Sequence, residues 1–320
     1  MASTTQVLQV TERRNLAPDV IELKFKAEDG TPLAAWEPGS HIDLRLADGL
    51  IRQYSLVEPV TGQDGTWTIA VLVEQLGRGG SRFIDRNLKE GTTVKTSGVR
   101  NHFEMSPGSK YLFIGGGIGI TPLIAQFRKA IASGASARLI YCGRERARMA
   151  YLTDLETEFP GLVEVFDLSE GQLLDVAGTI DSLDADTQVY CCGPDSLMDA
   201  VEIAMSTSDR LPYMHLERFT PRNPADFNDN FEFEVFAATS DIEFTVPDDE
   251  SILVAADFEG ILVPGDCLEG TCGSCETRVI EGEVEHRDTI LSAAQQATNE
   301  VMMICVSRAA PGCKRLVLDL

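Results

Sequence analysis

Short stretches in which apolar and polar residues alternate fill the first hundred positions of the chain. They include VIELKFKA at 20–27, HIDLRLA at 41–47 and WTIAVLVEQ at 67–75. Turn signals such as Asp29-Gly30 and Pro38-Gly39 separate them. An alternation with a period of two, interrupted by regular turns, predicts the strands of an antiparallel barrel or sandwich.

The pattern changes at Tyr111. A buried apolar stretch, YLFI, is followed by a glycine-rich turn, by PLIAQFRKAIA with helical periodicity, and by a second apolar stretch, ARLIYCG. This order is typical of the strand-helix-strand unit of a parallel sheet. VEVFDL and QVYCCG continue as strands, and TDLETEF and SLMDAVEIAMS as helices. We therefore expect an α/β domain of the kind that binds nucleotides.

A polar segment near position 220, TPRNPADFNDN, is almost free of aliphatic residues and is typical of a linker. Behind it, FEFEVFAA and IEFTV alternate as two strands of a hairpin, and ESILVAADFEG resembles a helix. The sequence thus divides at 1–105, 106–219, 220–230 and 231–320.

Composition excludes several classes of protein. The 320 residues include 27 Lys and Arg and 50 Asp and Glu, for a formal net charge of −23, which argues against direct nucleic-acid binding. The longest apolar run, Tyr111 to Ala125, is too short for a membrane helix and contains four glycines. No secretory signal is recognisable at the amino terminus, so we expect a cytoplasmic protein. Residues 225–320 alone carry a net charge of −15.

Four of the eight cysteines give the strongest chemical signal. Cys267, Cys272 and Cys275 enclose gaps of four and two residues, and Cys305 follows 30 positions later. This is the ligand spacing of a plant-type [2Fe-2S] cluster, in which four thiolates hold two irons. Glycines inside the loop allow it to turn tightly and to direct N–H groups at the sulfurs. A four-cysteine zinc site is the alternative, but such sites usually contain two Cys-x-x-Cys pairs.

A second signal is the turn GGGIGITP at 115–122, which joins a predicted strand to a predicted helix. Glycines at this point let a pyrophosphate approach the backbone and the positive end of the helix. Isoleucine replaces the last glycine of the usual dinucleotide fingerprint, so a purely structural turn is the alternative. The candidate binding residues are Gly116, Gly117, Gly119, Thr121 and Pro122.

Cys192-Gly193-Pro194 ends another strand of the same predicted sheet. Open α/β sheets bind ligands at the carboxyl ends of their strands. Two candidate loops at one sheet edge favour nucleotide binding more strongly than either loop alone.

A third signal is Arg52-Gln53-Tyr54-Ser55 in a strand of the first region. An arginine can hold a phosphate, a tyrosine can pack on a flat heterocycle, and a serine hydroxyl can bond to its edge. An ordinary amphipathic strand is the alternative. The later run GRGGSR at 77–82, with Gly80 and Ser81, suits a second phosphate contact.

These motifs, in this order, resemble the phthalate dioxygenase reductase family over essentially the whole chain. The resemblance implies a multidomain protein with an antiparallel β-barrel flavin domain, an α/β nucleotide-binding domain with a parallel sheet, and an α+β plant-type ferredoxin domain. The family's flavin and phosphate motifs match Arg52, Tyr54, Ser55, Gly80 and Ser81. Its nicotinamide motifs match Gly116 to Pro122 and Cys192-Gly193-Pro194, and its cluster ligands match Cys267, Cys272, Cys275 and Cys305.

The resemblance also implies cofactors for each region. It assigns FMN to 1–105, NAD to 106–219, a linker to 220–230 and the [2Fe-2S] cluster to 231–320. FMN is expected rather than FAD because the ferredoxin region follows the other two. Glu217-Arg218-Phe219 resembles the element that joins the NAD domain to the ferredoxin, so Phe219 and Cys192 are candidate neighbours of the flavin and nicotinamide rings. NADH is the expected coenzyme, although Arg144, Arg146 and Arg148 leave NADPH open.

The implied function is an NADH-dependent reductase in which a flavin converts a two-electron hydride into single electrons for the iron-sulfur cluster. The redox chemistry resides in the cofactors, so no general base from the protein is expected. The four histidines lie far apart in sequence and none forms a Cys-x-His pair, which places the electron acceptor outside this chain.

A separate terminal oxygenase, of the Rieske type, is therefore the expected partner, docking at the acidic ferredoxin region. Acidity that is unrelated to docking is the alternative explanation of this charge. Two other functions remain open. One is a reductase for a different one-electron acceptor, such as a non-Rieske monooxygenase or a haem-thiolate cytochrome. The other is a redox sensor without turnover.

Overall fold

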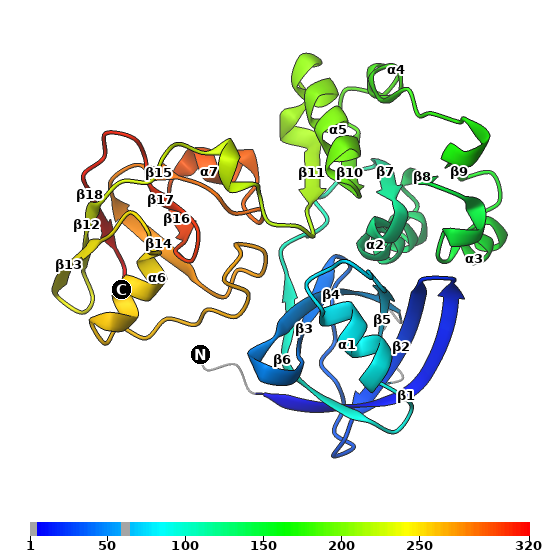
Figure 1. Ribbon diagram of the computed structural model, residues 1–320. Helices are drawn as coiled ribbons and strands as arrows, with labels where there is room; N and C mark the ends of the chain where they lie inside the picture. The colour runs from blue at the N-terminus through cyan, green and yellow to red at the C-terminus, as the bar shows by residue number, and fades with distance from the viewer. Residues whose placement is uncertain (1–4, 59–64) are drawn as a thin grey trace. The chain divides into compact units, whose positions relative to one another are not determined.

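The computed structural model describes residues 5–58 and 65–320 and forms two compact units, Met1–Glu217 and Arg218–Leu320 (Figure 1). The first unit holds the predicted barrel and nearly all of the predicted α/β region. The second holds the segment after the predicted linker together with that linker.

The first region of the first unit is a closed antiparallel barrel with the strand order β1-β2-β5-β4-β3-β6. Alternate residues of β2, such as Leu23 and Phe25, are fully buried in the barrel core, because successive side chains of a strand point to opposite faces. Strand β2 begins and ends at the predicted residues. The barrel comprises β1 (Gln6–Ala17), β2 (Val20–Ala27), β3 (Ser40–Arg45), β4 (Ile51–Glu58), β5 (Trp67–Leu72), β6 (Thr93–Asn101) and the helix α1 (Gly80–Asn87).

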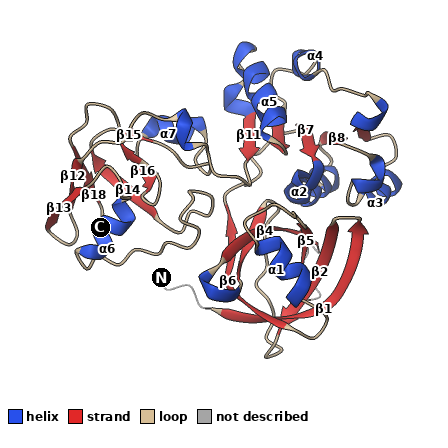
Figure 2. Cartoon of the chain, in the orientation of Figure 1, coloured by secondary structure: helices blue, strands red, loops and turns tan. Residues whose placement is uncertain are grey.

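The second region of the first unit is the predicted parallel sheet, with strand order β11-β10-β7-β8-β9. Tyr111 and Phe113 pack in one apolar cluster, and Leu112 and Ile114 pack in another on the opposite face, so helices cover both faces (Figure 2). The strands are β7 (Lys110–Gly116), β8 (Ser136–Gly143), β9 (Val163–Asp167), β10 (Gln188–Cys192) and β11 (Met214–Glu217). The helices are α2 (Ile120–Ala132), α3 (Leu152–Glu158), α4 (Val176–Asp181) and α5 (Asp195–Thr207).

Helix α2 fixes the sheet to the barrel within this unit. The Gln126 side chain on α2 is fully buried and donates to the Phe103 carbonyl at 2.6 Å. Arg128 on the same helix forms ion pairs with Glu58 of β4 and, at 2.6 Å, with Glu158. These contacts hold the strand that carries the predicted flavin motif in a defined position relative to the glycine-rich turn.

The second unit is α+β, as predicted. Its main sheet has the order β13-β12-β18-β14-β16 and mixes parallel and antiparallel pairs, and β15 pairs with β17. Helix α6 begins after Ser251 because the serine hydroxyl accepts from the Val254 amide. The elements are β12 (Phe233–Ala237), β13 (Ile242–Val246), α6 (Ile252–Phe258), β14 (Glu276–Glu281), β15 (Val284–Glu285), α7 (Ala293–Thr298), β16 (Val301–Met303), β17 (Arg308–Ala309) and β18 (Arg315–Leu318).

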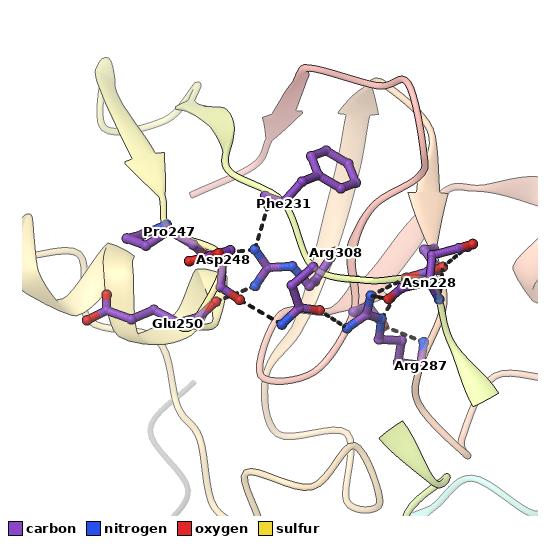
Figure 3. Close-up of polar contacts among 10 residues, drawn as sticks. Asn228, Phe231, Pro247, Asp248, Glu250, Arg287 and Arg308 are labelled. Carbon is purple, nitrogen blue, oxygen red and sulfur yellow. Dashed lines mark hydrogen bonds and ion pairs between the residues drawn. The ribbon is translucent and has the colours of Figure 1, made fainter. Parts of the chain in front are cut away.

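A buried arginine on β17 holds three segments of the second unit together (Figure 3). Arg308 is 3% exposed. Its guanidinium donates to the backbone carbonyls of Phe231 at 2.9 Å, of Pro247 at 2.7 Å and of Glu250. Burial lowers the pKa of this arginine, and the three carbonyl oxygens replace the hydration that its charge has lost.

Arg287 holds the end of the predicted linker in the same way (Figure 3). It forms an ion pair with Glu285 and donates to the Asn230 side chain at 2.7 Å and to the Asn228 carbonyl at 3.2 Å. The last residues of the predicted linker, 228–230, are therefore bound to the second unit.

Candidate functional site

The four cysteines predicted as cluster ligands come together in the second unit. Three lie in the loop before β14, and Cys305 follows β16. The thiol of Cys267 interacts with those of Cys272 and Cys305, and the thiol of Cys275 interacts with that of Cys305. Within residues 5–58 and 65–320, no group of three His, Cys, Asp or Glu side chains is arranged as a ready-made metal site, and none of the four cysteines forms a disulfide. Three thiols on one loop and a fourth just after β16 are the donor set of a two-iron cluster.

The loop directs backbone N–H groups at one of these sulfurs. The amides of Glu269 and Thr271 both donate to Cys267 Sγ at 3.4 Å. Bonds from the thiols of Cys272 and Cys305, from the Glu269 amide and from the Thr271 side chain lower the pKa of Cys267. The loop therefore stabilises the thiolate, which is the form that binds iron.

A positive φ at Leu268 and at Gly270 gives the loop this shape. At Gly270, where φ is +70°, a Cβ atom would lie 2.6 Å from Val306 Cγ2 and 3.0 Å from Asp288 Cα. Only glycine adopts this positive φ without strain and also has no Cβ atom to meet these neighbours.

The two predicted nucleotide loops of the first unit lie backbone against backbone. A Cβ atom on Gly119 would lie 2.3 Å from the Cys192 carbonyl oxygen, and one on Gly193 would lie 2.9 Å from Gly116 Cα. Both loops follow the carboxyl ends of adjacent parallel strands, β7 and β10. The structure thus brings together motifs that lie far apart in sequence.

The glycine-rich turn is also held from within. Tyr141 donates its hydroxyl to the Gly117 carbonyl at 3.1 Å, and the Thr121 hydroxyl donates to the Ile118 carbonyl at 3.0 Å. Thr121 and Pro122 are buried, so their side chains shape the turn. The first turn of α2 has no side-chain cap, and its amides suit a pyrophosphate.

Cys192 lies at the sheet edge between two neighbours. Its register partners are Gly115 of β7 and Glu217 of β11. Burial raises the pKa of the Cys192 thiol, and the nearby Glu217 raises it further. Burial also raises the pKa of Glu217 to about 8. The motif at 217–219 predicts a joining element but gives no sign of the role of the Glu217 carboxyl group, because its position beside Cys192 depends on the pairing of β10 with β11.

The flavin motif lies on β4, where alternate residues share a face. Gln53 donates to Asp43 of β3 at 2.9 Å, and Ser55 stands opposite His41. Burial raises the pKa of Tyr54, and the charges of Arg52, Glu74 and Arg78 act on its hydroxyl. The structure therefore places the predicted flavin strand beside the loop that precedes α1.

Arg52 also reaches the amino terminus of α1. A Cβ atom on Gly80 would lie 2.7 Å from Arg52 Cγ, so the absence of a side chain makes room for the arginine. The Ser81 hydroxyl accepts from the Glu74 amide at 3.1 Å and keeps its hydrogen as a donor. A guanidinium, a hydroxyl and the uncapped amides of a helix amino terminus fit a phosphate group.

Phe219 belongs to the second unit and is 41% exposed. Its predicted place beside the flavin stays a prediction. In the part of the chain that the structure describes, no helix has the length and apolar character needed to cross a membrane.

Comparison with known proteins identifies relatives of this chain. The 2Fe-2S iron-sulfur cluster binding domain family matches residues 235–310. The carnitine monooxygenase reductase subunit of Acinetobacter baumannii is 37% identical over 313 residues, which cover 97% of this chain and 96% of that protein.

Solved structures also match almost the whole chain. Phthalate dioxygenase reductase, described as a modular structure for electron transfer from pyridine nucleotides to [2Fe-2S], matches with a TM-score of 0.69 and 31% identity over 99% of this chain and 98% of its own. An intact type IV self-sufficient cytochrome P450 monooxygenase matches with a TM-score of 0.89 and 35% identity over 99% of this chain, which spans 41% of that longer protein. The chain belongs to the phthalate dioxygenase reductase family.

Proposed function

We propose that this chain is the NADH-dependent reductase component of an oxygenase system and passes electrons through FMN and a [2Fe-2S] cluster to a separate terminal oxygenase. The observation that carries the proposal is the four-thiol group of the second unit, on the same chain as the paired loops at the carboxyl ends of β7 and β10. A coenzyme that gives two electrons and a cluster that takes one at a time need a flavin as converter.

The proposed roles follow the predicted regions. In the barrel, 1–105, Arg52, Gly80 and Ser81 bind the FMN phosphate, and Tyr54 and Ser55 contact the ring. In the α/β region, 106–219, the glycine-rich turn and the first turn of α2 bind the pyrophosphate of NADH. Cys192-Gly193-Pro194 places the nicotinamide, 220–230 is the linker, and 231–320 carries the cluster on its four cysteines.

Burial at Cys192 supports its assigned role. The side chain is 1% exposed and its pKa is raised, so the thiol stays protonated at neutral pH. A neutral, buried thiol at this sheet edge would help to keep water away from the nicotinamide.

One experiment tests these assignments together. The purified protein, kept anaerobic, is titrated with NADH while visible absorbance and the electron paramagnetic resonance of the cluster are recorded, and the extracted flavin is identified. FMN, two irons per chain and reduction of both centres are expected. A flavin that bleaches while the iron stays ferric would refute the proposal. Cys275→Ser, which lacks one predicted cluster ligand, provides the flavin spectrum without an intact cluster as a reference.

The proposed partner is a Rieske-type oxygenase that docks at the acidic ferredoxin region. The net charge of −15 on residues 225–320 supports docking to a basic surface. Electron delivery to the partner should then slow as salt rises, because screening weakens steering between exposed charges. Electron delivery that is equally fast at low and high salt would count against docking through charge.

A cytoplasmic location is part of the proposed function.

A haem-thiolate cytochrome is the second candidate acceptor. The match to a self-sufficient cytochrome P450 over 99% of this chain supports it. Reconstituted turnover with each purified class of oxygenase distinguishes the two, since only the true partner gives product in step with NADH consumption.

A further inference from the structure

Three arginines follow β8, and the structure distinguishes them by their partners. Arg146 bonds through one nitrogen to both carboxylate oxygens of Glu156, at 2.7 and 2.8 Å. Arg148 forms an ion pair with Asp19 and lies 3.8 Å from Glu145. Within residues 5–58 and 65–320, the exposed guanidinium of Arg144 has no hydrogen-bond or ion-pair partner. One cation of the three is thus available for a ligand.

The backbone that carries Arg144 is held in place. Its carbonyl accepts from the Ser169 amide at 3.0 Å, and the next turn is fixed by the Arg146 amide, which donates to Asp167 at 3.0 Å. A side chain on a fixed backbone loses less freedom when it binds a ligand.

The topology places Arg144 on the adenosine side of the coenzyme. The sheet order changes direction between β10 and β7, so a dinucleotide bound at the turn after β7 extends toward β10 at one end and toward β8 at the other. Cys192 marks the β10 end, where the nicotinamide is proposed. Arg144 is the first residue after β8, the position from which such folds contact the adenosine ribose.

The acidic residue at the end of the next strand is held by its own loop. Asp167, opposite Gly143 at the end of β9, is 4% exposed. Its carboxylate accepts from the amide and hydroxyl of Ser169, at 2.9 and 2.7 Å, and from the Arg146 amide. These hydrogen bonds hold the carboxylate inside the loop, and the exposed carboxylate of Glu145, next to Arg144, lies 3.8 Å from Arg148.

We propose that Arg144 binds the 2′-phosphate of NADPH, so that this chain accepts NADPH as well as NADH. The inference rests on the proposed function, since it assumes that a nicotinamide coenzyme binds at this sheet edge. A guanidinium binds phosphate through two parallel N–H bonds, which a 2′-hydroxyl cannot match.

The test compares Arg144→Gln with Arg146→Gln in the full-length holoprotein. The rate of flavin reduction is measured with NADPH and with NADH, and the binding of 2′,5′-ADP and of ADP is measured by calorimetry. In Arg144→Gln, the kcat/KM ratio of NADPH to NADH and the affinity ratio of 2′,5′-ADP to ADP should both fall about tenfold to a hundredfold, the loss expected for a charged hydrogen bond. In Arg146→Gln, whose side chain is paired with Glu156, both ratios should stay as in the parent protein.

Three outcomes would overturn the inference. They are a parent protein that does not prefer 2′,5′-ADP to ADP, unchanged ratios in Arg144→Gln, and equal falls in the two variants. Failure of the proposed function looks different, because then neither coenzyme reduces the flavin of the parent protein.

Discussion

The nucleotide turn of the first unit and the cysteine loop of the second are both rich in glycine, but they need it for different reasons. In the nucleotide turn, Gly119 has an ordinary negative φ and is required because the backbone at Cys192 lies against it. In the cysteine loop, Gly270 combines a positive φ with close contacts to Asp288 and Val306. Gly119 is constrained by the strand beside it, and Gly270 is constrained also by its own backbone conformation.

The two glycines differ in how far they depend on the rest of the fold. Gly119 is constrained by backbone that the pairing of β7 and β10 brings against it, so its requirement for glycine should disappear when the sheet unfolds. The cysteine loop draws part of its shape from local conformation, so its requirements should act on cluster assembly directly.

The largest effect is expected for Gly270→Ala. The left-handed conformation of alanine and the overpacking together cost about 2–4 kcal/mol. Iron and sulfide assays should show a large loss of cluster, while flavin content is unchanged. Gly260→Ala is the matched control, because Gly260 has a φ of +80° and a Cβ atom added to it would have nothing within 4 Å. Equal cluster loss in both variants would mean that the contacts at Gly270 do not matter.

Gly119→Ala should have the next largest effect. Its Cβ atom would meet backbone atoms of β10, which cannot move as a side chain can, at a cost of about 1–3 kcal/mol. We expect a lower unfolding temperature of the first unit and a higher KM for NADH. Gly117→Ala, in the same turn, has no close contact and a φ of +55°, so it should cost only about 1 kcal/mol. The reverse order of the two variants would contradict packing as the reason for Gly119.

Gly80→Ala should affect ligand binding more than folding. The atom that a new Cβ meets is Arg52 Cγ, which can move aside and take the guanidinium out of position. FMN should bind about tenfold more weakly, as expected when a charged hydrogen bond to phosphate is lost. Fluorescence titration of the flavin-free protein measures this. Arg52→Gln should give a similar loss, and the double variant little more; additive losses would show that the two residues act separately.

The smallest expected effect is a pH dependence of the stability of the first unit, caused by His215. His215 stacks on Tyr190 at 4.3 Å and bonds to Gln188 at 2.8 Å. Burial lowers its pKa from 6.5 to about 4. The unfolded chain therefore binds a proton at a higher pH than the folded chain does, and the first unit should lose stability as pH falls from 6.5 toward 4.

The matched variant is His215→Gln, whose amide keeps a bond to Gln188 but does not titrate. Its unfolding temperature should fall less than that of the parent protein over this pH range. The parent and the variant losing stability in parallel would show that other groups cause the acid effect.

The fold was predictable from the sequence wherever one period dominated. The strand at 20–27 and the switch to parallel strands and helices after Tyr111 are confirmed, because burial on one or both sheet faces imposes those patterns. Local spacing also picked out four cysteines that the fold brings together, three on one loop and Cys305 just after β16; their role as cluster ligands stays a prediction.

The sequence could not show which groups neutralise one another across the fold. The partners of Arg148 and Arg146 are Asp19, which is 129 residues away, and Glu156, which is 10 away. Strand pairing also determines the hydrogen bond from Tyr141 to the Gly117 carbonyl and the position of Glu217 beside Cys192. By sequence alone, Arg144, Arg146 and Arg148 are equal candidates for binding a phosphate. Only the partners of Arg146 and Arg148 single out Arg144.

The contacts of Arg308 and Arg287 determine where a fragment that contains the second unit should begin if it is to be fused to another protein. The family match begins at residue 235, and the sheet begins at Phe233. A fragment cut at either point would lack the Phe231 carbonyl and the Asn228 and Asn230 groups that Arg308 and Arg287 bind. It would leave a buried guanidinium short of acceptors. A fragment of this chain that is fused to another protein as an electron donor should therefore begin before Asn228.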